Sequence, residues 1–224
     1  MSPTLSTAAY ATLRRAVLTG ELAPNAFVSD RELCERYALS RTPVREAVLR
    51  LRDERLVETV PRRGVRVLPL EVDDVREIHQ ITRALEREAA LAIAARAPRR
   101  AALAGLERAV ADMEEAIGTE DRERWAAADA RFHAGVAAAG DNARLEAIYG
   151  SLRGVTDRAR HFALHLRELP VVSTREHRAM LEAMLGGEAA ALDRLYREHW
   201  ERTTGELVAL LERHARPAAL GVAG

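Results

Sequence analysis

The stretch that decides the fold is Ser40-Arg41-Thr42-Pro43-Val44-Arg45-Glu46-Ala47, which runs on to Leu51. Apolar residues at positions 44, 47, 48 and 51 recur with helical spacing and predict one buried face. Ser40 is a favourable N-cap, and Pro43 falls in the first turn, where a missing N–H does little harm. Arg41 and Arg45 are four residues apart on the other side, beside Thr42. The stretch therefore predicts a short helix with a buried face and an arginine-bearing exposed face.

A second short helix is expected just before this stretch. Ser29-Asp30-Arg31-Glu32 forms a capping box, in which Ser29 and Glu32 satisfy each other's free amides. Ala38-Leu39 then makes a tight turn into the helix that follows. Two short helices joined in this way, with exposed arginines at the start of the second, are typical of a helix-turn-helix. The start of its second helix contacts base edges in the major groove, where Arg can bind guanine through two donors.

The chain then predicts a β-hairpin over residues 57–60 and 65–68, joined by Pro61-Arg62-Arg63-Gly64. A hairpin tipped by two arginines is suited to lie along a phosphate backbone or in a minor groove, as a wing does. The alternative is a small helical domain with a solvated basic hairpin. The capping box, the recognition stripe and the basic hairpin, in this order after a first helix over residues 5–19, favour DNA binding.

The rest of the chain predicts helices alone. Six segments are expected at about 74–97, 99–118, 121–139, 143–166, 174–185 and 188–214, with Asp73 or Asp74 capping the first. Their natural arrangement is an antiparallel bundle. The expected fold class is mainly α: an N-terminal winged helix-turn-helix domain at 1–70, an all-α antiparallel bundle at 71–216 that binds an effector and dimerises, and a frayed tail at 217–224.

Charge separates the two parts of a chain whose formal net charge is zero. Residues 1–70 hold 12 Arg and 8 acidic residues, whereas residues 71–224 hold 22 Arg and 26 acidic residues. The net charge is therefore +4 for residues 1–70 and −4 for residues 71–224, which suggests a polyanionic partner for the first part only. The single cysteine, Cys34, excludes an intramolecular disulfide, and no apolar run is long enough to span a bilayer. We therefore expect a cytoplasmic protein without a membrane partner.

Four residues of the second part are candidate metal ligands. Asp129 and His133 are four apart and share one helix face. His177 follows Ser173-Thr174-Arg175-Glu176, another possible capping box, and His199 lies in the last segment. A helical hairpin folded at residue 188 would bring these two histidines to one level. One carboxylate and three imidazoles suit zinc, nickel, manganese or iron. The alternative is that each histidine is a surface or hydrogen-bonded core residue.

The stretch at 40–47, followed by Leu51 and Glu54-Arg55-Leu56-Val57, closely resembles the GntR family of regulators, and most of all its FadR subfamily. The resemblance covers the whole first domain. It implies DNA contacts from the first short helix, the recognition helix and the residue before the wing glycine, here Arg31, Arg41, Arg45 and Arg63. The chain departs from the family at Asn25 and Arg55, where Gly is usual. Both lie away from the recognition face, so the DNA-binding interpretation is unchanged.

The second part resembles the six-helix, VanR-like effector domain of the same subfamily, with weaker identity. Asp129-Ala130-Arg131-Phe132-His133 matches a family phrase, and His177 and His199 match in position. Members with all four residues bind a divalent metal, so the resemblance implies a metal ion here, with zinc as the first candidate. Arg83 matches an arginine often found near the family's effector pocket; the alternative is an exposed helix arginine.

The sequence thus predicts a ligand-responsive repressor. Its partners would be double-stranded operator DNA, a second copy of the chain in a homodimer, and a small organic acid that fills open positions on the metal. DNA-contacting residues are expected at Arg31, Arg41, Thr42, Arg45, Arg62, Arg63 and Gly64. Alternatives are a regulator that senses the ion itself, a DNA-binding dimer with a structural metal, or a metal-dependent hydrolase. No general base is evident beside the four residues, so an enzyme is not expected.

Overall fold

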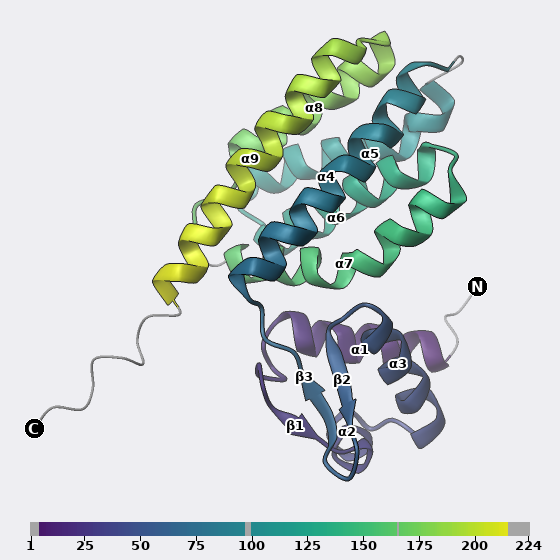
Figure 1. Ribbon diagram of the computed structural model, residues 1–224, viewed down its shortest axis with the longest axis vertical. Coiled ribbons are helices and arrows are strands. Elements are labelled where there is room, and N and C mark those ends of the chain that lie inside the picture. The colour runs from purple at the N-terminus through teal and green to yellow at the C-terminus, as the bar shows by residue number, and fades with distance from the viewer. Residues whose placement is uncertain (1–4, 97–99, 165, 215–224) are drawn as a thin grey trace, which may run out of the picture. The chain divides into compact units, whose positions relative to one another are not determined.

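The computed structural model describes residues 5–96, 100–164 and 166–214 (Figure 1). Within these ranges the chain has nine helices and three short strands, which confirms the mainly α fold class. Two compact units are present: Met1–Leu70 with Gly150–Phe162, and Glu71–Tyr149 with Ala163–Gly224. The tail expected at 217–224 lies outside the described residues. Among the described helices, none is long and apolar enough to cross a membrane.

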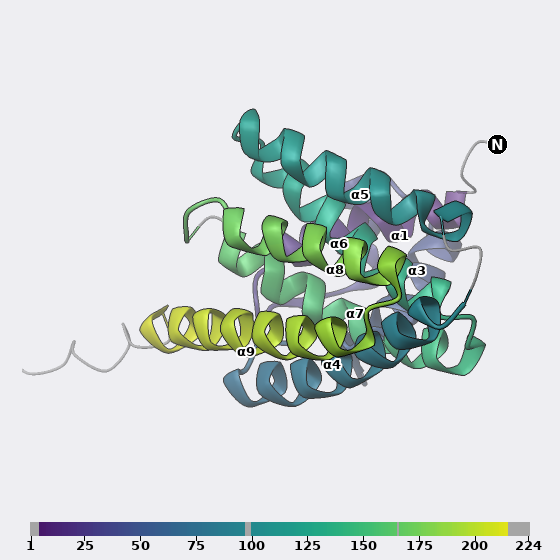
Figure 2. The ribbon, with the colours of Figure 1, turned by 90° about the horizontal axis from the view of Figure 1, so that it is seen from above.

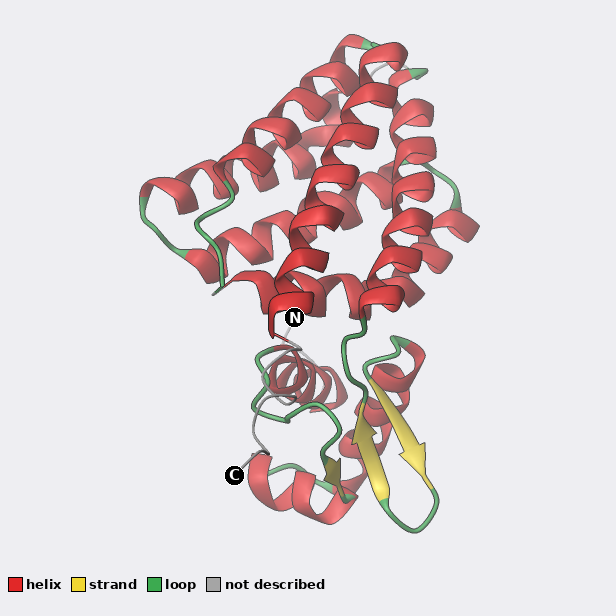
Figure 3. Cartoon of the chain, turned by 60° about the vertical axis from the view of Figure 1, so that its left-hand side comes forward, coloured by secondary structure: helices red, strands yellow, loops and turns green. Residues whose placement is uncertain are grey.

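The first unit is a winged helix. Its elements are α1 (Leu5–Leu18), β1 (Phe27–Val28), α2 (Asp30–Tyr37), α3 (Arg41–Asp53), β2 (Val57–Val60) and β3 (Gly64–Val67). The strands form one antiparallel sheet in the order β1-β3-β2, the sheet visible in Figure 3. Leu13, Leu33, Val44 and Leu51 are buried in the core that joins α1, α2 and α3. The apolar stripe at 44, 47, 48 and 51 therefore faces inward as predicted.

The starts of the two short helices differ in how they are capped. Ser29 and Glu32 form the predicted capping box, with the Ser29 side chain accepting from the Glu32 amide. Ser40 stands at the N-cap of α3, but its side chain makes no capping hydrogen bond there. β1 was not predicted, because a strand of two residues leaves no alternating pattern in the sequence.

Four non-glycine residues in this unit adopt a left-handed backbone, and Asn25 and Arg55 are two of them. Asn25 has φ 64° and Arg55 has φ 55°. Glycine reaches this region without the steric cost that a Cβ atom brings. These are the two positions where the chain departs from the related family, so the backbone explains why glycine is usual there.

Residues 150–162 belong to the first unit through an ion-pair network. Arg14 of α1 donates to Glu54, at the C-cap of α3, and to the buried Asp157. Asp157 is also paired with Arg153 and Arg160. These cations lower the pKa of Asp157, against the raising effect of its burial. The sequence offers no spacing that would reveal a pairing so distant along the chain.

The second unit is a helical bundle (Figure 2). It contains α4 (Val72–Ala94), α5 (Arg100–Gly118), α6 (Arg122–Ala139), α8 (Val171–Gly186) and α9 (Ala189–His214), with both ends of α7 (Ala143–Leu164). α5 packs on α6, and α9 packs on both α4 and α8. The core is built around Trp125, Phe132, Met113, Met180 and Tyr196, all at most 2% exposed. α4 also packs on α6 and α8, so α4 is the helix that joins α6, α8 and α9 around one core.

Two predicted helix starts in this unit are wrong. α4 begins earlier than expected, with Glu71 rather than Asp73 or Asp74 at its N-cap. α8 likewise begins at Val171, so Ser173 lies inside the helix and is not a cap. Glu176, the glutamate of the predicted capping box, instead contacts His199 and Arg202 of α9.

Candidate metal centre and DNA-binding surface

Three buried imidazoles meet in the core of the helical bundle. His133 comes from α6, His177 from α8 and His199 from α9, and each is at most 3% exposed. One ring nitrogen of each lies within 4.8 Å of one from each of the other two. The predicted hairpin of α8 and α9 thus brings His177 and His199 together, with ring centroids 4.8 Å apart.

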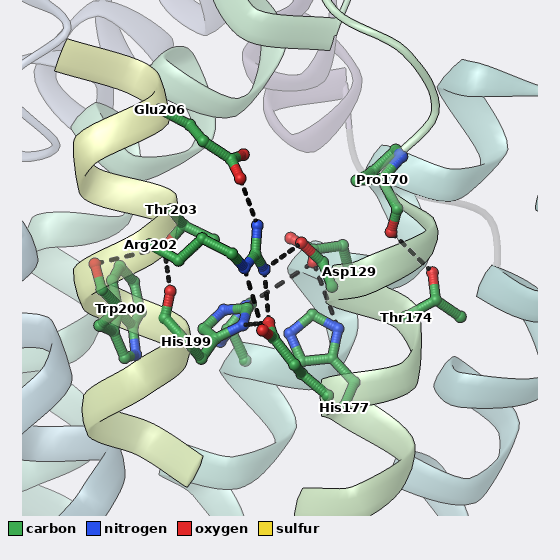
Figure 4. A network of polar contacts seen from close by, with 12 residues as sticks. Asp129, Pro170, Thr174, His177, His199, Trp200, Arg202, Thr203 and Glu206 are labelled. Carbon is green, nitrogen blue, oxygen red and sulfur yellow. Dashed lines mark hydrogen bonds and ion pairs between the residues drawn. The ribbon is translucent and has the colours of Figure 1, made fainter. Parts of the chain in front are cut away.

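Asp129 adds a carboxylate to this cluster. It lies one turn before His133 on α6, is 4% exposed, and points toward His177 in Figure 4. Its Oδ1 atom is 3.6 Å from His177 Nδ1 and 3.7 Å from His133 Nε2. The structure therefore brings all four predicted ligand residues together in one cluster.

Two further carboxylates contact the outer ring nitrogens of His133 and His199 and so orient these rings. Glu86 of α4 lies 2.8 Å from His133 Nδ1, and Glu176 of α8 lies 2.6 Å from His199 Nδ1. A proton shared with the carboxylate at Nδ1 leaves the Nε2 lone pair of each ring directed at the centre. This is how histidine ligands of metals are usually held. Glu86 and Glu176 were missed as site residues, although Glu86 is a carboxylate on the buried face of its helix.

The electrostatics of the cluster favour a neutral imidazole at His199. Burial lowers the pKa of His199, and the neighbouring His133 acts in the same direction against the raising effect of Glu176. Burial tends to raise the pKa of Glu176, but hydrogen bonds from His199 and Arg202 outweigh it and lower that pKa to about 2. A neutral imidazole beside an ionised carboxylate is the protonation state that metal ligation requires.

The four residues fit a divalent ion by donor type and spacing. Nitrogen and oxygen ligands bind zinc at about 2.0–2.2 Å, so ligands of one ion lie no more than about 4.4 Å apart. The Asp129 oxygen is 3.6 Å from the His177 nitrogen and 3.7 Å from the His133 nitrogen, both within this limit. The imidazole nitrogens lie within 4.8 Å of one another, an upper distance that exceeds the limit by a few tenths of an ångström. A small contraction would bring all four onto one ion, while their role as ligands stays a prediction.

Two arginines lie beside the centre. Arg202 of α9 donates to Glu176, to Ser173 at 2.9 Å and to Glu206 at 2.8 Å (Figure 4). Arg167, just before α8, donates to Glu206 at 2.7 Å. Burial lowers the pKa of Arg167, and the charges of Glu206 and Asp129 oppose that shift. Positive charge is thus available close to the Asp129 side of the centre.

Arg83, the predicted effector residue, lies elsewhere on α4. Its guanidinium is 3.6 Å from Glu201 in a pair whose side chains are 37% and 60% exposed. One turn later, Glu86 occupies the inward face of the same helix. Arg83 is thus half-exposed on α4 and its role toward an effector stays a prediction, whereas Arg167 and Arg202 lie closer to the centre.

The predicted DNA-contacting residues of α2 and α3 are exposed in the first unit. Arg41, Thr42 and Arg45 lie on the outer side of α3, away from its buried stripe. Arg45 is 3.2 Å from Asp30, and Arg31 pairs with Glu35, but these arginine side chains remain 70% and 79% exposed. Exposed ion pairs of this kind are weak, so both guanidinium groups can exchange their partners for phosphates or bases.

The wing is held in a defined shape. Arg62 and Arg63 are exposed at its tip, and Arg63 lies over the Phe27 ring of β1, 3.8 Å from the ring centroid. Gly64 has φ 95°, and a Cβ atom there would meet the Val28 carbonyl oxygen at 2.7 Å. Glycine at this position therefore lets the hairpin close against β1 and presents the two arginines.

Comparison with known proteins agrees with both halves of this description. Residues 5–67 match the model for bacterial regulatory proteins of the gntR family, and residues 77–202 match the FCD domain. A transcriptional regulator from the TAR-I ttuE-ttuC' intergenic region of Agrobacterium vitis is 38% identical over 128 residues, covering 56% of this chain and 75% of that protein. The transcriptional repressor RspR of Escherichia coli K12 is 26% identical over 193 residues, covering 85% and 83%.

A solved structure shares the fold. Escherichia coli McbR/YncC superimposes with a TM-score of 0.76 at 21% identity, over 95% of this chain and 100% of that one. At this identity the likeness concerns the fold alone. Together with the two family matches, it shows a winged helix joined to a helical domain.

Proposed function

Since the chain belongs to the GntR family of bacterial regulatory proteins and has an FCD effector-binding domain, we propose that it is a repressor controlled by a metal-bound organic acid. It is a DNA-binding transcriptional regulator and not an enzyme. In this proposal residues 1–70 bind the operator in the cytoplasm, and residues 71–216 bind the effector and dimerise. The helical domain would be of the FadR-subfamily type.

The observation that supports the metal is the arrangement of the histidine rings. Three buried imidazoles and the Asp129 carboxylate meet at one point, and outer carboxylates hold His133 and His199 by Nδ1. Zinc is the first candidate, with nickel, manganese or iron as alternatives, because all accept nitrogen and oxygen donors. Four protein ligands on an octahedral ion leave two positions for other ligands.

A carboxylate suits those two positions by charge and by surroundings. The metal supplies a Lewis acid that can bind one or both carboxylate oxygens. Arg167 and Arg202 add positive charge nearby, and their shared partner Glu206 can be displaced as an acid binds. A coupling of about 1.4 kcal/mol between the two ligands would change operator affinity tenfold.

DNA recognition is proposed to use the outer side of α3 and the wing. Arg41 and Arg45 would contact base edges and Thr42 the edges or backbone, while Arg31, Arg62, Arg63 and the Gly64 backbone would contact phosphates or the minor groove. One such domain reads only a few base pairs. A homodimer would double the site and require an operator with two-fold symmetry.

His177→Ala tests the link between metal and signal, with His214→Ala as control. His214 lies at the end of α9, outside the cluster. We expect His177→Ala to lose both metal and effector response while keeping operator binding, and His214→Ala to keep all three. Elemental analysis would measure the metal, and titration of DNA selected from a random pool, with and without small carboxylic acids, would measure the response. Stoichiometric metal in His177→Ala would contradict the site, and a full response without metal would contradict the link.

A further inference from the structure

One face of α7 carries three residues that contact the winged-helix part of the first unit. Asp157 and Arg158 follow Gly154 by three and four positions, so the three residues share one side of the helix. All three are buried. Their partners are distant in the sequence, since Asp157 and Arg14 are 143 positions apart. These contacts explain why Gly150–Phe162 belongs to the same compact unit as Met1–Leu70.

Gly154 lies directly against the end of α3. A Cβ atom added to it would overlap with the carbonyl oxygen of Glu54, the C-cap residue of α3, and would lie 2.8 Å from the Glu54 Cβ atom. Carbon atoms make favourable contacts at about 3.5–4.0 Å, so alanine does not fit here. Gly150, one turn earlier, differs: among the described residues, no atom beyond its own stretch of helix would lie within 4 Å of its Cβ atom. The close approach to α3 therefore requires glycine at position 154 and not at position 150.

A buried chain of ion pairs joins Asp157 to the same end of α3. The Arg14 guanidinium donates through Nη2 to Asp157 Oδ2 at 2.5 Å and through Nε to Glu54 Oε2 at 2.8 Å. Tyr10 donates to the other carboxylate oxygen of Glu54. The side chains of Arg14, Glu54 and Asp157 are at most 15% exposed, so loss of one charge leaves a partner buried with less opposite charge beside it. Asp157 therefore acts on α3 through Arg14 and Glu54.

Arg158 reaches the base of the wing. Its guanidinium donates to the carbonyl oxygen of Leu68, the residue that follows β3. The Leu68 amide in turn donates to the Leu56 carbonyl, just before β2, at 3.1 Å. Leu68 thus ties the two strands of the wing together, and Arg158 holds it in place. One face of α7 therefore contacts both elements that are proposed to bind DNA.

We propose that Gly154, Asp157 and Arg158 are positioning residues for operator binding, which hold α3 and the wing in the relative position that DNA requires. None of the three contacts DNA. A recognition helix and a wing must reach one duplex together, and fixing them beforehand lowers the ordering cost of binding. This rests on the proposed function, which places the operator contacts within residues 1–70, and it adds that full operator affinity depends on α7 as well.

Titration of the full chain with DNA selected from a random pool by the unaltered chain would test this role. Gly154→Ala should weaken binding by about tenfold and Asp157→Asn by at least about threefold, because each loosens the hold on the end of α3. The slope of log affinity against log salt concentration should not change in either variant, since neither removes a phosphate contact. Gly150→Ala and Glu146→Gln, at exposed positions of the same helix, are the controls and should bind as the unaltered chain does.

Hydrogen exchange followed by mass spectrometry separates positioning from support of folding. Asp157→Asn keeps the shape of the side chain, and it decides the matter if Gly154→Ala does not fold. Amides at the end of α3 and at the base of the wing should exchange faster in this variant, whereas those of α2, which has its own capping box, should keep their protection. Faster exchange throughout the first unit, α2 included, would show a role in folding alone and would overturn the proposal.

Arg41→Ala, titrated in parallel, distinguishes failure of this proposal from failure of the proposed function. A loss of affinity smaller than about threefold in either α7 variant would overturn the positioning role. If Arg41→Ala loses affinity while the α7 variants do not, only the positioning role is wrong. If Arg41→Ala binds as tightly as the unaltered chain, the recognition helix and the positioning role are wrong together.

Discussion

Replacing Glu86 by Gln should weaken metal binding although Glu86 is not a metal ligand. The Glu86 carboxylate is fully buried and lies 2.8 Å from His133 Nδ1. Gln keeps the shape and an acceptor oxygen but removes the charge that makes the imidazole a better ligand. Loss of such an outer carboxylate typically weakens metal binding by about 10–100-fold, which corresponds to about 1.4–2.8 kcal/mol.

Competition of the chain with a fluorescent chelator for zinc would measure this effect. Glu88→Gln is the matched control, because Glu88 is an exposed glutamate on the same helix, two residues later. Its zinc affinity should equal that of the unaltered chain. If Glu86→Gln bound zinc within twofold of the unaltered chain, the reasoning that the outer carboxylates hold the histidines for a metal would be refuted.

Three other predictions concern the first unit and the assembly. Replacing Arg41 or Arg45 by Ala should cost roughly 1–3 kcal/mol of operator binding and relax base preference. Replacing Arg63 by Ala should chiefly lower the salt dependence, by about 0.9 in the slope of log affinity against log salt concentration. If Arg41→Ala bound the operator as tightly as the unaltered chain in matched salt, the assignment of α3 as the recognition helix would be wrong. Arg55→Gly should raise the free energy of unfolding by about 0.5–1 kcal/mol, because a left-handed backbone costs a Cβ-bearing residue more than glycine, while Asn25→Gly should change it less; chemical denaturation would decide, and a loss of stability in Arg55→Gly would contradict the argument. Light scattering should show a dimer at micromolar concentration, and a monomer both free and on DNA would exclude the proposed symmetric operator.

Local patterns predicted the fold well where their partners are near in sequence. Ser29 and Glu32 cap α2 as expected, because both belong to one helical turn. The same pattern misled at Ser173, where the helix begins two residues earlier and Glu176 bonds His199 and Arg202 of α9. A pattern of four residues cannot show that a distant helix will compete for its carboxylate.

In the candidate site, too, contacts between residues near in sequence were predicted and contacts between distant helices were not. Asp129 and His133 share a helix face by spacing alone, and the hairpin of α8 and α9 brings His177 to His199. No spacing links Glu86 to His133, because their contact depends on how α4 packs in the bundle. The one available signal was a carboxylate placed on a stripe of buried residues, which is a costly position unless it is paired.

The most direct test of the proposed metal centre is X-ray absorption spectroscopy at the zinc edge of the zinc-loaded chain. The arrangement of Asp129, His133, His177 and His199 predicts three imidazole nitrogens at about 2.0–2.1 Å with further oxygen ligands and no sulfur. A spectrum with fewer than three imidazoles, or with a sulfur ligand from Cys34, would contradict it.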